Sequence, residues 1–67
     1  MPLKTLAMKL KEIREIRGLT QVALSKKAKM KQPYLARLES GAETNPTLDT
    51  LRRLAKVLKC TVAELVE

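Results

Sequence analysis

The sequence predicts an all-α fold, a compact single domain of five short helices over residues 1–67. The 67-residue chain is 45% hydrophobic, but Tyr34 is its single aromatic residue, so its core must be aliphatic. Apolar residues recur at spacings of three and four, which is typical of helices with one buried side. No segment alternates with period two, and the β-branched residues do not cluster, which argues against a sheet.

The first helix is expected from about Thr5 to Arg17. Its apolar side would consist of Leu3, Leu6, Leu10 and Ile13. Gly18 should end the helix in the left-handed conformation. Thr20 then caps a second helix, about Gln21 to Ala28, by accepting a hydrogen bond from a free backbone N–H. The inward side of this second helix would be Leu24, Ser25 and Ala28.

A turn of three residues, Lys29 to Lys31, should lead into a third helix over about 32–39, with Met30 pointing inward. Pro33 falls in the first helical turn, where its missing N–H is tolerated. Leu35 and Leu38 give this helix an inward side. The outward side would consist of Pro33, Ala36 and Arg37, with Gln32 at its start.

The polar segment from Ser40 to Pro46 reads as a loop. Thr47 can cap a fourth helix, about Leu48 to Leu58, whose apolar stripe would be Leu48, Leu51, Leu54, Ala55 and Leu58. Its opposite side carries Arg52, Arg53, Lys56 and Lys59, and the first three of these are expected to face solvent. Thr61 and Glu64 have the spacing of a capping box, which predicts a short fifth helix. Val62 and Leu65 should close the core.

Charge and composition narrow the functional classes. Fourteen basic and seven acidic residues give a net charge of +7, which favours a polyanionic partner. No apolar run could span a bilayer, and the N-terminus has no signal-peptide pattern. The single cysteine, Cys60, is typical of a reducing compartment. Without a histidine, a metal-ligand cluster or a phosphate-binding glycine loop, the chain is not expected to be an enzyme or to hold a metal or cofactor.

The segment from Thr20 to Gly41 is the most informative part of the chain. It consists of two short amphipathic helices joined by a tight turn. It carries Lys26, Lys27, Lys29, Lys31 and Arg37, and no acidic residue precedes Glu39. A basic helix-turn-helix over about 21–39 indicates binding to DNA.

Linked motifs extend this pattern over the chain. They are Arg14 seven residues before Gln21, GLTQ at 18–21, PYLARLESG at 33–41, NPTLDTLRRLAKVL at 45–58 and TVAEL at 61–65. Together, in this order and spacing, they are specific, and residues 6–66 resemble the lambda-repressor-like family of DNA-binding domains. The resemblance implies a small transcriptional regulator of the repressor type, with its recognition helix at about 32–39 in the major groove.

The resemblance also implies roles for individual side chains. Gln21 would contact a DNA phosphate and brace Gln32, whose amide would read a base edge such as adenine. Arg37 would reach guanine, and the small Ala36 would allow close approach to a thymine methyl. Backbone amides at the starts of the second and third helices would meet phosphates.

The same resemblance implies a structural role for two residues, and the sequence differs from the family pattern at four positions. Arg14 and Glu39 match a pair that forms a salt bridge in family members. Lysines at 29 and 59 replace glycines that are usual in the family, which implies strained left-handed backbone. Pro33 replaces a base-contacting polar residue of several relatives, and the acidic Glu43 weakens the case for a phosphate clamp in the following loop.

Several assignments remain open from the residues alone. The lysines at 26, 27, 29 and 31 could contact phosphates or form a solvated face, and Tyr34 could flank the core or donate its hydroxyl to a phosphate. Cys60 is expected to be buried.

The chain could instead be a protein-interaction module, such as an antitoxin or a co-regulator adaptor. Its contact surface would then be Met8, Ile16, Val22 and Val57, which lie off the core stripes. A membrane-surface peptide fits less well, because the basic residues do not face one long apolar side.

A single short recognition helix reads few base pairs, so a homodimer on a two-fold symmetric operator is expected, formed in solution or only on DNA. Its contacts would lie near the fifth helix and the loop before the fourth. We expect a cytoplasmic protein of bacterial, archaeal or phage origin, with no membrane association and no small-molecule effector.

Overall fold

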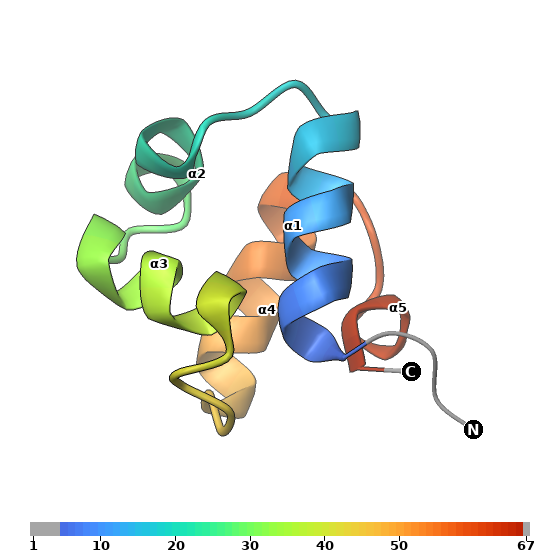
Figure 1. Ribbon diagram of the computed structural model, residues 1–67. Coiled ribbons are helices and arrows are strands. Elements are labelled where there is room, and N and C mark those ends of the chain that lie inside the picture. Colours follow the sequence, from blue (N-terminus) through green and yellow to red (C-terminus); the bar gives the residue numbers. More distant parts are fainter. Residues whose placement is uncertain (1–4, 67) are drawn as a thin grey trace.

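The computed structural model describes residues 5–66, and every regular element in that range is a helix. The helices are α1 (Leu6–Ile16), α2 (Gln21–Lys27), α3 (Gln32–Ser40), α4 (Leu48–Leu58) and α5 (Val62–Val66). Figure 1 shows α2 and α3 together at one side of the molecule, with α5 beside the start of α1 at the other. The predicted five-helix fold is confirmed, and Leu3 lies outside the described residues.

The core is a cluster of leucines to which every helix contributes. Its fully buried side chains are Leu10, Leu24, Leu35, Leu38, Leu54, Leu58 and Leu65, and Ala28 and Ala55 fill the spaces between them. Each buried leucine contributes about 1.5–3 kcal/mol relative to an exposed one. Through this cluster α1 packs against α3 and α5, and α2 packs against α3 and α4, which fixes the helix-turn-helix unit on its support.

Threonines begin four of the helices. The hydroxyls of Thr5, Thr20 and Thr47 accept hydrogen bonds from the backbone N–H groups of Met8, Ala23 and Thr50. Thr61 and Glu64 form the predicted capping box, in which each side chain accepts from the other's backbone N–H, at 3.1 and 3.4 Å. These bonds satisfy donors that a helix start leaves without partners.

Three helices end in the same way, with a left-handed residue followed by an apolar one. The left-handed residues are Gly18, Lys29 and Lys59, with φ of 72°, 57° and 56°. The next N–H donates back across the helix end: Leu19 to Arg14, Met30 to Ser25, and Cys60 to Ala55. This is the Schellman arrangement, and each following side chain packs against the core. The expected left-handed lysines are therefore present.

Two arginines hold the backbone at these helix ends, and neither contact was predicted from the sequence. Arg53 donates to the carbonyl of Lys29 at 3.1 Å, so α4 is tied to the turn between α2 and α3. Arg17 donates to the carbonyls of Leu58 and Lys59, at 2.7 and 3.4 Å. Helical periodicity gives the side on which an arginine lies, but it does not show which carbonyl comes within reach.

Three burial predictions were wrong in part. Leu48 was expected in the inward stripe of α4, but it is the first residue of that helix and is 53% exposed. Val57 was assigned to an outer surface, but it is half-buried against the core. Cys60 is also half-buried, and it packs against the edge of the core cluster.

We expect Lys59→Gly to stabilise the domain by about 0.5–1 kcal/mol, because glycine adopts the left-handed conformation without steric cost. For a domain of this size the melting temperature would rise by roughly 2–8 °C. Thermal unfolding followed by circular dichroism measures this change. Lys59→Ala is the matched control, since it removes the same charge but keeps the Cβ, and an equal gain in Lys59→Ala would show that charge is the cause.

Candidate nucleic-acid interface

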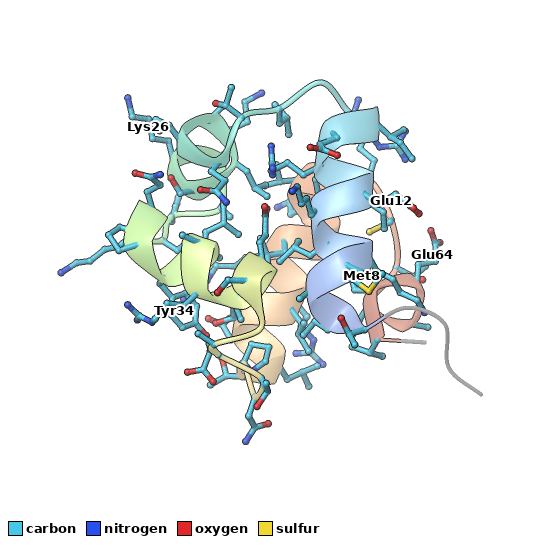
Figure 2. The ribbon with its side chains drawn as sticks, viewed as in Figure 1. Met8, Glu12, Lys26, Tyr34 and Glu64 are labelled. Carbon is cyan, nitrogen blue, oxygen red and sulfur yellow. The ribbon has the colours of Figure 1, made fainter. Side chains whose placement is uncertain are left out.

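The outward side of α3 and the turn before it form one exposed surface. Lys29, Lys31, Gln32, Pro33 and Arg37 are exposed there, while Tyr34 and Ala36 are half-buried beside them. Lys31 begins the helix without a side-chain capping bond. Figure 2 shows Lys26 and Tyr34 on this α2–α3 side, and Met8, Glu12 and Glu64 on the opposite side around α1 and α5.

A buried ion pair joins α1 to the end of α3. Arg14 Nε donates to Glu39 Oε2 at 2.6 Å and Arg14 Nη2 donates to Glu39 Oε1 at 3.0 Å, so the pair is bidentate. The two side chains are only 10% and 3% exposed. Arg14 Nη1 also donates to the carbonyl of Leu19 at 2.7 Å. The hydrogen bonds that Arg14 donates to Glu39 raise the pKa of Arg14, and burial opposes this effect.

Two glutamines extend the hydrogen bonds of this ion pair to the protein surface. Gln21 Nε2 donates to Glu39 Oε1 at 3.1 Å, and Gln32 Nε2 donates to Gln21 Oε1 at 3.4 Å. The contact between Gln21 and Gln32 is the one that the family resemblance implied. The bond from Gln21 to Glu39 was missed, although both residues had been singled out separately. We call these four residues, Arg14, Glu39, Gln21 and Gln32, the Arg14–Gln32 relay.

Arg37 and Tyr34 form a second local unit on α3. The guanidinium carbon of Arg37 lies 5.7 Å from the centroid of the Tyr34 ring, within range of a cation–π interaction. The ring itself packs against the core. Tyr34 therefore flanks the core, and it also supports the arginine one turn further along the exposed side.

The positive charge extends from this surface around the end of α2. Lys26, Lys27, Lys29 and Lys31 are all exposed. A cleft of about 530 Å³ lies next to them, and its lining comprises Lys27, Ala28, Lys29, Arg53, Lys56 and Val57. Only Arg53 of its four cations has an acidic partner among the described residues, the exposed Asp49 one turn earlier on α4. Such a surface attracts polyanions over a range set by the ionic strength.

Within residues 5–66, no group of three or more His, Cys, Asp or Glu side chains is arranged to hold a metal ion. In the same part of the chain, no helix has the length and apolarity needed to cross a membrane.

Cys60 is expected to react slowly with thiol reagents. Burial raises the pKa of its thiol, Glu64 adds to this effect and Arg17 opposes it. The thiolate is the reactive form, so alkylation by iodoacetamide should reach half of its maximal rate at a higher pH in the folded protein than in urea. Because the folded-state pKa is raised, the corresponding contribution to stability is present at neutral pH and is lost as pH rises through that pKa. Equal pH profiles for the folded and unfolded protein would contradict this expectation.

Comparison with known proteins agrees with this geometry. A family model described as helix-turn-helix matches residues 10–65. The chain is 42% identical over 62 residues to the HTH-type transcriptional regulator DdrOP3 of Deinococcus deserti, covering 92% of this chain and 47% of that protein. It is 40% identical over 62 residues to the immunity repressor protein of Bacillus phage phi105, covering 92% and 42% respectively.

A solved structure shows the same architecture. The crystal structure of SinR in complex with DNA has a TM-score of 0.89 and 28% identity, and the match covers 91% of this chain and 97% of that one. SinR comes from Bacillus subtilis. These matches define a DNA-binding type of domain. The chain belongs to the helix-turn-helix family, in its lambda-repressor-like form. It spans less than half the length of the two curated relatives.

Proposed function

We propose that this chain binds double-stranded DNA sequence-specifically as part of a transcriptional repressor. The observation that carries the proposal is the Arg14–Gln32 relay, which holds an amide at the start of an exposed helix inside a basic surface. The curated relatives are a transcriptional regulator and a phage immunity repressor, which supports the same function. The bacterial and phage origin of these relatives also supports a cytoplasmic location for the protein.

In this proposal α3 lies in the major groove. The side chains facing DNA would be Gln21, Lys29, Lys31, Gln32, Pro33, Tyr34, Ala36 and Arg37. Gln32 and Arg37 read base edges, Ala36 allows close approach, and Gln21 and the lysines contact phosphates. Arg14 and Glu39 support the surface from below without touching DNA.

Selection from a pool of random-sequence duplexes tests this function. The protein should enrich one consensus sequence, and a fluorescently labelled duplex of that sequence should bind more tightly than a scrambled one at the same salt concentration. If the protein enriches no consensus and binds both duplexes equally, the proposal is wrong.

We expect the protein to bind this site as a homodimer. The consensus should then be two-fold symmetric, with half-sites about one helical turn apart, roughly 34 Å. Footprinting at saturation should protect both halves, and analytical ultracentrifugation of the complex should give two chains per duplex. A single asymmetric half-site at saturation would contradict the dimer.

The competing function is a protein-interaction module. The observation in its favour is apolar exposure, since Met8, Ile16 and Val22 are 52%, 70% and 45% exposed. These residues do not explain the exposed Gln32 and Arg37 or the surrounding lysines, which a protein adaptor does not need. DNA binding accounts for the basic surface and is therefore preferred.

A further inference from the structure

We propose that Glu39 is a positioning residue that determines base preference without touching DNA, by fixing which way the Gln32 amide faces. This inference rests on the proposed function, since it assumes that Gln32 reads a base. It concerns the hydrogen-bond polarity of the Arg14–Gln32 relay, from the core outward.

The polarity starts at the Glu39 carboxylate. Its side chain is 3% exposed, and it accepts two hydrogen bonds from Arg14. An ionised carboxylate only accepts hydrogen bonds. The Gln21 amide 3.1 Å away must therefore turn its NH₂ group toward Glu39. The reversed amide would place two acceptor oxygens against each other in a site with little water.

The orientation of the Gln21 amide in turn determines that of the Gln32 amide. With its NH₂ group held by Glu39, Gln21 presents its carbonyl oxygen to Gln32. Gln32 then turns its own NH₂ group toward that oxygen, at 3.4 Å. Gln32 is exposed, so its carbonyl oxygen and its second N–H remain for an outside partner.

This fixed orientation has a consequence for specificity. A free glutamine amide can rotate by half a turn and exchange its donor and acceptor positions, so it fits more than one base edge. An amide with a fixed donor and a fixed acceptor matches adenine, which presents an N7 acceptor and an N6 donor in the major groove. The negative charge of Glu39 therefore selects one of two orientations of Gln32.

The test measures base preference for folded variants. Wild-type protein and Gln32→Ala are first taken through duplex selection, and the base pair whose preference Gln32→Ala loses is the one that Gln32 reads. Glu39→Gln, whose amide can donate as well as accept, should reduce the preference at that base pair about fivefold or more. Preferences at other positions of the site should stay within about twofold of wild type.

Two further variants separate positioning from stability. Arg14→Lys weakens the ion pair but leaves the carboxylate facing Gln21, so it should lower the melting temperature and keep the base preference. The double substitution Arg14→Met and Glu39→Met removes both charges, and such replacements of buried pairs commonly keep a protein folded. The double variant should lose the preference as Glu39→Gln does. It also serves as the test if Glu39→Gln fails to fold.

The outcomes are distinct. Loss of preference in both Glu39 variants and its retention in Arg14→Lys support the inference. Retained preference in either folded Glu39 variant overturns it, as does equal loss in Arg14→Lys. If the wild type selects a sequence but Gln32→Ala changes no position, this inference fails while the proposed function stands. If the wild type selects no sequence, both fail.

Discussion

Glu39→Ala is expected to lower the free energy of unfolding by about 3–5 kcal/mol, because it leaves the Arg14 guanidinium buried without a counter-charge. The Arg14 side chain is only 10% exposed, so water cannot replace the lost carboxylate. A domain of this size has a net stability of only about 3–5 kcal/mol, so much of this variant should be unfolded at 25 °C. Urea titration followed by circular dichroism measures the loss.

A double-mutant cycle checks the cause. Arg14→Ala should cost a similar amount, because it leaves Glu39 buried and charged. The double alanine variant should cost much less than the sum of the two single variants, since neither uncompensated charge remains. Additive losses would show that the two residues act independently. Ser25→Ala is a useful reference, because Ser25 is also buried but its hydroxyl donates to the carbonyl of Val22 within its own helix.

The helices could be predicted from the sequence because their signals are local. Leucine spacing gave the buried sides, and threonines marked the helix starts at residues 20, 47 and 61. Gly18 marked a helix end through its own backbone preference. The prediction that Leu48 is buried was wrong, because position on a helical wheel does not show how far a helix extends beyond the elements that cover it.

The sequence predicted which residues belong to the Arg14–Gln32 relay, but it did not predict that they form one connected set of hydrogen bonds. Gln21, Gln32, Arg14 and Glu39 were identified from motif spacing and resemblance, as two separate pairs. Their union depends on the bond between Gln21 and Glu39, which brings together residues 18 positions apart and needs the packing of α2 against α3. The contacts of Arg17 and Arg53 with distant carbonyls also depend on helix packing. Every residue has a backbone carbonyl, so the sequence does not show which one accepts the hydrogen bond.

The largest expected effect on binding separates base reading from phosphate attraction. Gln32→Ala and Arg37→Ala should each weaken binding to the selected duplex by about 1–3 kcal/mol and change binding to random DNA little. Both side chains are exposed on α3 and lie outside the leucine core, so the fold should tolerate their removal. Fluorescence anisotropy with both duplexes gives the ratio of specific to random affinity for each variant.

The lysines supply the matched control. Lys29→Ala and Lys31→Ala should weaken binding to both duplexes by similar factors. Each should also reduce the slope of log affinity against log salt concentration, by up to about 0.9 for one lost phosphate contact, because fewer counterions are released. Alanine at position 29 has the same left-handed strain as lysine, so the effect of Lys29→Ala on affinity comes from the lost charge and not from a change in the backbone. If the Gln32→Ala and Arg37→Ala variants both keep the wild-type ratio of specific to random affinity, α3 is not the element that reads the sequence.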